Sequence, residues 1–229
     1  AYTNVDKAED EVEKADLVNH KAVASLADVA GKHNALLIHI STDYVFDGNT
    51  GIPYGDDDRT NPLNVYGRTK ADGEKAVQDS GCRYIILRTS WLYGTEGENF
   101  VKTILRKSSE SPVLNVISDQ TGTPTYAYDL AYFIFRIIEE GMTDRTGIYN
   151  FSNEGVCSWY DFAHEICEMS GNLCEVFPCR TDEYPRKAVR PHFSVLDKTK
   201  VKKTFEIEIP HWKDSLKICM DILKDMKNF

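Results

Sequence analysis

The chain has 229 residues, of which 41% are hydrophobic and 28% are charged, and its formal net charge is −9 at pH 7. The acidic balance argues against nucleic acid or an anionic membrane as a partner, and no apolar run approaches the roughly 18 residues that a membrane-spanning helix needs. The length and the apolar content suit one large or two small α/β domains.

The first predicted element is a helix over residues 10–31, which follows a turn formed by residues 1–9. Its apolar side chains recur near the helical period, and Gly31 is a plausible stop. We expect this helix to face the core with Val12, Ala15, Val18, Val23, Leu26 and Val29.

The apolar run over residues 35–40 predicts a buried strand of a parallel sheet. The run is followed by Ser41, Thr42 and Asp43. Ligands of open α/β sheets bind beyond the carboxyl ends of the strands, so Thr42 and Asp43 are expected on the floor of a ligand crevice. A loop rich in turn-forming residues follows over residues 47–61.

A helix predicted over residues 63–81 carries Tyr66 and Lys70 on one face. A phenol is a poor acid or base at neutral pH, and a nearby ammonium lowers its pKa. Together with the hydroxyl of Thr42, this pair could give a proton to a carbonyl oxygen as hydride reaches its carbon. A Tyr-x3-Lys pair alone is expected by chance, but here a second strand over residues 84–88 follows and completes a β-loop-α-β unit.

The second half of the chain also alternates helices and strands. Ser158 is expected to cap a helix that ends at Met169, with Asp161 in place of the usual Glu of a capping box. The helix over residues 128–140 has a predicted core face of Leu130, Phe133, Ile134, Ile137 and Ile138. The other predicted elements are strands 113–117 and 148–151, helices 100–107, 197–203 and 212–226, and short strand and loop over 174–191.

Three further segments could bind a ligand. Trp91 follows the second strand, where an aromatic residue usually caps a core, and only the family resemblance given below places it against a substrate. The loop over residues 119–125, which contains Gln120, has turn residues that suggest a fixed shape near a ligand. Residues 180–190 hold a local basic cluster in an acidic chain, which is either a solvated loop or a phosphate site, and Arg190 is the best candidate for the latter.

Six ordered blocks resemble the extended short-chain dehydrogenase/reductases over nearly the whole chain. The resemblance implies an α/β fold, with an NAD(P)-binding Rossmann-like parallel sheet and a smaller α/β substrate domain. It places the cofactor domain at residues 1–110, completed by 128–151, and the substrate domain at 111–127 and 152–229. The matching blocks are residues 1–9, 41–48, 62–70, 88–94, 119–125 and 190–197.

The resemblance implies reduction of dTDP-4-dehydro-L-rhamnose to dTDP-L-rhamnose by NADPH or NADH, in nucleotide-sugar biosynthesis for cell-surface polysaccharide. It assigns catalysis to Tyr66, Lys70 and Thr42. The cofactor is expected against Ala1, Tyr2, Thr3, Ile40, Tyr66 and Lys70, and the dTDP-linked sugar against Thr42, Asp43, Trp91, Gln120 and Arg190.

Members of this family begin with a strand and a Gly-rich turn that holds the cofactor pyrophosphate, and no Gly-x-x-Gly-x-x-Gly occurs in this sequence. The resemblance therefore implies that roughly the first 60 residues of a typical member are absent from this chain. We expect such a truncated chain to hold its cofactor poorly, and the reductase activity to need the missing segment.

Two alternatives remain open. One is a sugar-nucleotide epimerase or dehydratase of the same superfamily, although elimination is disfavoured because Asp43 is followed by Tyr44 and not by Glu. The other is a non-catalytic regulatory subunit that resembles the methionine adenosyltransferase β subunit. A homodimer is the expected assembly of the protein.

The six cysteines contain no Cys-x2-Cys pair, and the six histidines show no metal spacing. We therefore expect no metal. The four cysteines between residues 157 and 179 could form a disulfide cluster, but scattered thiols in an α/β enzyme more simply indicate a reduced, cytoplasmic protein.

Overall fold

The structure is a computed structural model that describes residues 1–227. The chain divides into two compact, interleaved units. Unit 1 comprises residues 1–89, 136–151 and 186–207, and unit 2 comprises residues 90–135, 152–185 and 208–229. The observed α/β fold class confirms the prediction from the sequence. The predicted division into a cofactor domain and a substrate domain concerns what each part binds, and it stays a prediction.

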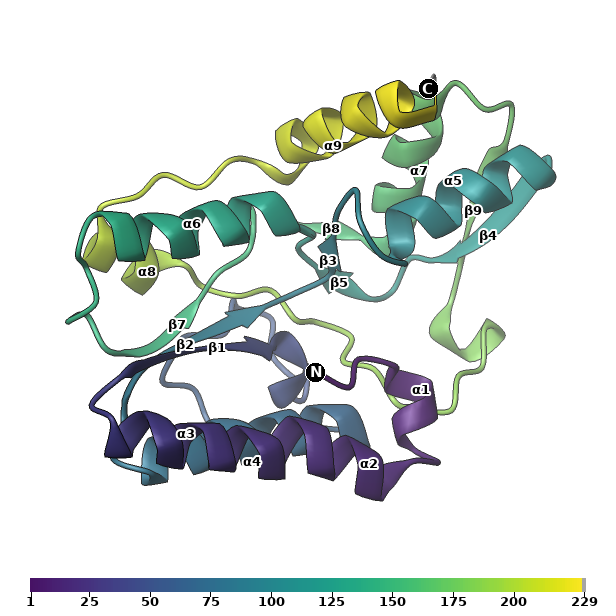
Figure 1. The fold of residues 1–229 in the computed structure, drawn as a ribbon. Coiled ribbons are helices and arrows are strands. Elements are labelled where there is room, and N and C mark those ends of the chain that lie inside the picture. Colours follow the sequence, from purple (N-terminus) through teal and green to yellow (C-terminus); the bar gives the residue numbers. More distant parts are fainter. Residues whose placement is uncertain (228–229) are drawn as a thin grey trace. The chain divides into compact units, whose positions relative to one another are not determined.

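Unit 1 is built on three parallel strands in the order β1, β2, β7 (Figure 1). The central strand is fully buried at Ile85, Ile86 and Leu87. The predicted parallel strand is present, but its residues 36–40 are only partly buried and not buried as predicted, because within the described residues β1 pairs with β2 alone. The strands are β1 (Leu36–Thr42), β2 (Arg83–Thr89) and β7 (Gly147–Asn150).

The helices that precede β1 and the helix that follows residue 63 pack on one side of this sheet, below β1 and β2 in Figure 1. After the short helix α1 (Val5–Ala8), the predicted first helix is present, but a π-helical turn at Leu17–Lys21 interrupts it. The parts before and after this turn are α2 (Val12–Asp16) and α3 (Ala22–Lys32). The helix predicted over 63–81 is α4 (Val65–Asp79).

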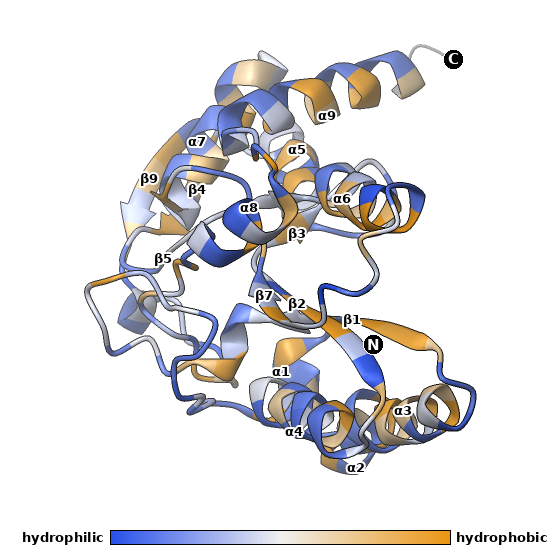
Figure 2. Ribbon diagram, turned by 90° about the vertical axis from the view of Figure 1, so that its left-hand side faces the viewer, coloured by the Kyte–Doolittle hydropathy of each residue, from blue (hydrophilic) through white to orange (hydrophobic). Residues whose placement is uncertain are grey.

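The predicted core face of the first helix is partly wrong. Val12, Leu26 and Val29 are 39%, 59% and 54% exposed, and hydrophobic residues are visible along α3 in Figure 2. The π turn changes the helical phase, and the side chains that α2, the π turn and α3 bury are Ala15, Asn19, Val23, Ala27 and Ala30.

Two glycines let α4 approach its neighbours closely. A Cβ at Gly73 would lie 2.2 Å from the carbonyl oxygen of Asn19, and a Cβ at Gly67 would lie 2.1 Å from that of Tyr44. Only glycine permits such backbone contacts. The position of α4, which carries Tyr66 and Lys70, is therefore fixed against the π turn and against the segment that follows β1.

The rest of unit 1 packs on β7 and on the loop after β1. Helix α8 (Thr199–Phe205) places Phe205 edge-on against Tyr149 of β7, with ring centroids 5.0 Å apart. Phe46 and Tyr54 stack with centroids 4.2 Å apart in a small cluster that includes Leu196. The cluster around Phe46 and Tyr54 holds the loop over residues 43–61 in place.

Within the described residues, unit 2 has three short two-stranded sheets and a large apolar core. The core contains Tyr93, Phe162, Ile166 and Leu216. The strand pairs are β3 (Leu92–Tyr93) with β6 (Thr125–Tyr126), β4 (Val113–Ile117) with β9 (Glu175–Cys179), and β5 (Thr121–Gly122) with β8 (Cys157–Ser158). Its helices are α5 (Phe100–Glu110), α7 (Trp159–Ser170) and α9 (Trp212–Lys227), and α6 (Ala127–Glu139) begins in it.

The predicted capping box of α7 is confirmed. The Ser158 hydroxyl accepts from the Asp161 N–H at 3.1 Å, and the Asp161 carboxylate accepts from the Ser158 N–H at 2.8 Å. The predicted core face of α6 is confirmed at Leu130, Phe133 and Ile137, whereas Ile134 is half-buried and Ile138 is 60% exposed. Ile138 was wrongly included because one helical step carries it away from the buried position of Ile137.

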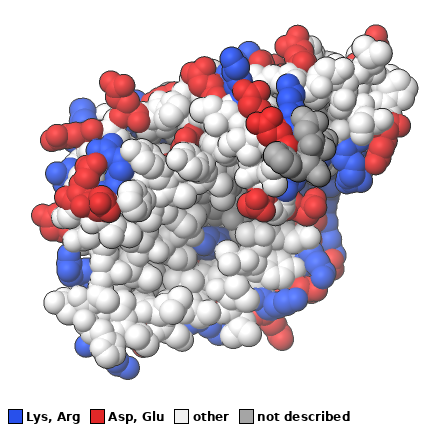
Figure 3. Space-filling view, turned by 45° about the horizontal axis from the view of Figure 1, so that its top comes forward, with Lys and Arg blue, Asp and Glu red and all other residues white. Residues whose placement is uncertain are grey.

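No helix within residues 1–227 is both long enough and apolar enough to cross a membrane. On the face drawn in Figure 3, basic and acidic side chains are interspersed.

Candidate active site

Thr42, Asp43 and Tyr66 come together at the carboxyl end of β1. Thr42 is the last residue of that strand, and Tyr66 lies in the first turn of α4. Asn64 caps α4 by accepting from the Gly67 N–H at 2.8 Å. The Thr42 hydroxyl is near enough to the Tyr66 phenol to act on its pKa, and it donates to Asp43 Oδ1 at 3.0 Å.

The pKa of Tyr66 is raised to about 12, chiefly by burial, while the hydrogen bond from Thr42 opposes the shift and the Asp43 carboxylate adds to it. The prediction that Lys70 lowers this pKa was wrong. The reason is that desolvation of the phenolate dominates, and the Lys70 ammonium donates instead to the carbonyl oxygen of Ile40 at 2.5 Å. At neutral pH the phenol therefore keeps a proton that it can donate.

Lys70 is buried beside His39. Burial lowers the pKa of Lys70 to about 8, against the opposing charge of Glu74. Burial also lowers the pKa of His39 to about 3, with a further contribution from the Lys70 ammonium 3.4 Å from its ring. The site therefore holds a cation whose protonation changes just above neutral pH.

Glu74 and Arg88 form a buried ion pair behind Lys70. Arg88 donates to both carboxylate oxygens of Glu74, at 3.0 Å from Nε and 2.7 Å from Nη2. The Ser41 hydroxyl donates to the same carboxylate, and Arg88 Nη1 donates to the Asp56 carbonyl oxygen at 2.9 Å. Sequence reasoning missed this pair, although Glu74 stands four residues after Lys70 on the same helix face.

Asp43 offers a buried acceptor. Its Oδ2 has no hydrogen-bond partner within residues 1–227. Burial raises the pKa of Asp43 to about 7, against hydrogen bonds from Ser194 and Thr42. Because buried polar atoms are normally paired, a hydroxyl of a bound ligand would satisfy this oxygen.

Asn19 is a second residue that sequence reasoning missed. It is 1% exposed in the π turn. Its side chain accepts from the Tyr2 N–H at 2.8 Å and donates to the Tyr2 carbonyl at 3.0 Å and to Thr69 at 3.3 Å. It therefore fixes the predicted cofactor-contact segment, in which Ala1 and Thr3 are exposed. The sequence signal that could have identified Asn19 is its position as a polar residue within an apolar helix face.

Arg190 is paired with an acidic residue of α1. Its guanidinium donates to both oxygens of Asp6, at 3.1 and 2.8 Å, and shares a hydrogen bond with Tyr44. The hydrogen bond from Arg190 holds the pKa of Asp6 below its usual value. Arg186 also lies near Asp6, at 3.7 Å. A phosphate that binds Arg190 would have to replace or share the contact with Asp6, and this role stays a prediction.

Trp91 and Gln120 lie in unit 2 and have partners there. Trp91 has a φ of +48° and stacks on Trp159 with ring centroids 3.6 Å apart. A Cβ at Gly122 would lie 2.7 Å from the Trp91 ring. Gln120 is 3% exposed and donates to Thr181 at 3.1 Å. Both side chains thus have structural contacts, and their contact with a substrate stays a prediction.

Comparison with known proteins gives a consistent result. A family model described as RmlD substrate binding domain matches residues 1–225. A dTDP-4-dehydrorhamnose reductase of Aggregatibacter actinomycetemcomitans is 43% identical over 226 residues, which cover 95% of this chain and 77% of the relative.

Solved structures agree with this similarity. A dTDP-4-dehydrorhamnose reductase from Clostridium acetobutylicum has a TM-score of 0.94 at 41% identity, covering 98% of this chain and 79% of that one. Another from Bacillus anthracis, solved in complex with NADP, has a TM-score of 0.93 at 36% identity, covering 97% of this chain and 78% of that one.

Proposed function

The chain belongs to the RmlD substrate-binding-domain family, and we propose that it reduces dTDP-4-dehydro-L-rhamnose to dTDP-L-rhamnose with NADPH or NADH. The similar proteins named dTDP-4-dehydrorhamnose reductase support the reaction, and the relative in complex with NADP supports the cofactor. The protein is then an oxidoreductase of nucleotide-sugar biosynthesis.

The observation that carries this proposal is the contact between Thr42 and Tyr66 at the carboxyl end of β1, with Lys70 on the same helix. Ligands of parallel α/β sheets bind at this edge. A neutral phenol with a pKa of about 12 holds its proton until a stronger base develops beside it. The oxygen of a carbonyl that accepts hydride becomes such a base.

In the mechanism that we propose, Tyr66 donates its proton to the keto oxygen at C4, and the Thr42 hydroxyl donates a hydrogen bond to the same oxygen. The unpaired Asp43 Oδ2 accepts from a sugar hydroxyl and fixes the orientation of the ring. When bound, the nicotinamide nucleotide supplies the hydride.

The residues present fit a ribose next to Tyr66. Lys70 supplies an ammonium, a group with three N–H donors, and it is held by the Ile40 carbonyl at 2.5 Å. Ribose hydroxyls can accept from such an ammonium and donate to a carbonyl. We propose that Tyr66, Lys70 and Ile40 hold the ribose and that Tyr2, fixed by Asn19, lies against the cofactor with Ala1 and Thr3.

On the substrate side we propose Arg190 for the diphosphate, and Trp91 and Gln120 for the sugar or the base. Arginine suits a diphosphate because its paired donors match phosphate oxygens. The division into a cofactor part and a substrate part, the cytoplasmic location and the homodimer also belong to this proposal. Light scattering in solution tests the homodimer.

The test is transfer of label from NADPH that is deuterated on its transferable hydrogen. The chain spans 77% of the A. actinomycetemcomitans relative, so the reaction is run with this chain and with this chain joined to the remaining residues of that relative. Deuterium at C4 of dTDP-rhamnose is the expected result. Consumption of NADPH without label in the sugar, or no consumption by a joined protein that binds NADPH, would overturn the proposal.

A further inference from the structure

Cys167 and Cys174 lie on the two sides of a tight turn in unit 2. Cys167 is in the last turn of α7 and is 5% exposed, whereas Cys174 immediately precedes β9 and is half-buried. Both are free thiols. Both side chains line the same cavity, and after burial the Cys174 thiol is one of the groups that raise the pKa of Cys167, so joining the two sulfurs needs only a local movement of the turn.

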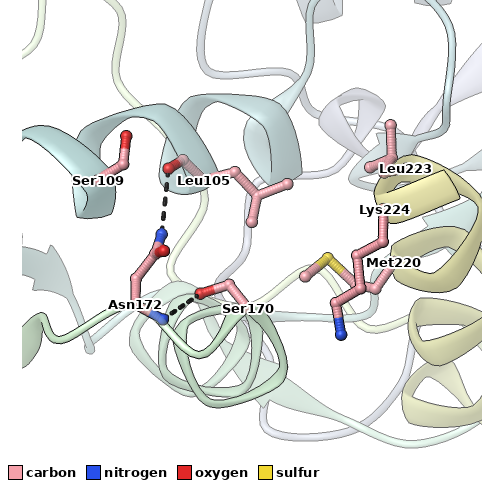
Figure 4. A pocket seen from close by; sticks show the side chains of 7 residues that line it. All are labelled: Leu105, Ser109, Ser170, Asn172, Met220, Leu223 and Lys224. Atoms are coloured by element: carbon pink, nitrogen blue, oxygen red, sulfur yellow. Dashed lines mark hydrogen bonds between the residues drawn. The ribbon is translucent and has the colours of Figure 1, made fainter. Parts of the chain in front are cut away.

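The turn between these two cysteines is held by hydrogen bonds. Gly171 ends α7 in the left-handed conformation, with a φ of +73°. The Asn172 N–H donates to the Ser170 hydroxyl at 3.1 Å, and the Asn172 side chain donates to the Leu105 carbonyl at 3.4 Å (Figure 4) and to the Ser108 hydroxyl at 2.7 Å. Asn172 thus anchors the turn that precedes Cys174 to α5.

Both cysteines line one cavity of about 590 Å³, which is large enough for a small-molecule disulfide. The cavity is also lined by the carboxylates of Glu168 and Glu175 and by the imidazole of His164. His164 lies 3.7 Å from Glu168. Two carboxylates disfavour an anionic reagent in this cavity and favour a neutral or cationic one.

We propose that Cys167 and Cys174 are a dithiol site that forms an intramolecular disulfide by exchange with neutral or cationic small-molecule disulfides. In the first step, the Cys174 thiolate attacks a sulfur of the reagent, which forms a mixed disulfide and releases one reagent thiolate. In the second step, the Cys167 thiolate attacks the Cys174 sulfur and releases the other reagent thiolate. The two cysteines are oxidised, the reagent disulfide is reduced to two thiols, and the two cysteine protons end on those thiols.

The order of the steps follows from access. Cys174 is the more exposed thiol, so it meets the reagent first. Burial raises the pKa of Cys167, which slows its direct reaction with a reagent in solution. Because both cysteines line one cavity, the second step takes place within the chain.

The experiment treats the folded chain with cystamine, 2-hydroxyethyl disulfide or oxidised glutathione, which are cationic, neutral and anionic. Thiols are then counted after denaturation, and peptides are mapped by mass spectrometry without reduction. We expect the six cysteine thiols to fall to four, with Cys167 joined to Cys174. Cystamine should react several-fold faster than oxidised glutathione at low salt, and the difference should shrink as salt rises.

Three variants complete the test, each checked for native circular dichroism. Cys167→Ser should stop at a mixed disulfide on Cys174, and Cys174→Ser should leave Cys167 unreacted. Cys179→Ser, a half-buried position in β9, should still form the disulfide. Persistence of both thiols in excess reagent, or a disulfide that maps to other cysteines, would overturn the proposal, and faster reaction with glutathione would overturn the assigned reagent class.

Discussion

Glu74 of α4 and Arg88 of β2 form a bidentate ion pair in which both side chains are at most 4% exposed. The pair joins the helix of Tyr66 and Lys70 to the sheet, and the hydroxyl of Ser41, next to Thr42, binds the same carboxylate. The geometry of the candidate site thus depends on a charged pair that supplies none of the proposed reacting atoms.

Removing one partner of this pair should be strongly destabilising. We expect Glu74→Ala to lower the free energy of unfolding by about 3–5 kcal/mol, because it leaves the Arg88 guanidinium buried without its carboxylate. The double variant Glu74→Leu/Arg88→Met should recover most of this loss. Urea unfolding measures the free energy of unfolding of both variants. A change below about 1 kcal/mol for Glu74→Ala would contradict the assigned role.

The exposed pair of Lys75 and Asp79 on the same helix is the matched control. Its N–O distance is 2.8 Å, but its side chains are 74% and 63% exposed. Lys75→Ala should therefore change the free energy of unfolding by at most about 1 kcal/mol.

Asp43 should make stability depend on pH. Its folded pKa of about 7 lies above its ordinary value of 3.8, so between these values the folded state keeps a proton that the unfolded state has lost. The free energy of unfolding should then fall as pH rises, by roughly 2–3 kcal/mol from about pH 5 to about pH 7. Asp43→Asn should remove this slope. Equal slopes in both proteins would show that Asp43 ionises normally.

Gly73→Ala should destabilise unit 1 by more than about 2 kcal/mol, because the added methyl group meets the carbonyl of Asn19 across the contact between the helices. Gly51, where an added Cβ has open space, is the control, and Gly51→Ala should be close to neutral. Thermal unfolding of the two variants makes the comparison. Similar midpoints would mean that α4 and the π turn are less tightly packed than described.

Lys70 should set the alkaline limit of the reaction. Because burial places its pKa at about 8, the ammonium loses its proton as pH rises through that value, and kcat/KM should fall there. In Lys70→Arg the charge persists to much higher pH, so the remaining activity should not show this fall. The measurement is a pH profile of kcat/KM for both proteins. An unchanged profile in Lys70→Arg would assign the limit to another group.

Local structure was the part of the fold that the sequence predicted best. The Ser158–Asp161 capping box joins two residues three positions apart, and both could be named from the sequence. The strand ending in Thr42 and the helix carrying Tyr66 also follow from periodicity and turn residues. Their convergence could be expected because the carboxyl ends of parallel strands share one edge.

Contacts between residues far apart in the sequence, and the effects of burial on pKa, could not be predicted from the sequence. Arg190 meets Asp6 across 184 positions of sequence. The π turn around Asn19 has no simple sequence pattern, and it changed which side of the first helix is buried. The pKa of Tyr66 was predicted in the wrong direction because spacing gives the distance to a charge but not the degree of burial.

The most direct test of the proposed mechanism is the turnover of dTDP-4-dehydro-L-rhamnose by Tyr66→Phe, in this chain joined to the remaining residues of the relative. This change removes the hydroxyl and keeps the ring beside Tyr44, 5.8 Å away. Tyr132→Phe, at a 53% exposed position, is the control. The account predicts a loss of roughly 10²–10⁴-fold in kcat for Tyr66→Phe and none for the control. Turnover by Tyr66→Phe that equals the unchanged protein would contradict the assignment of Tyr66 as the proton donor.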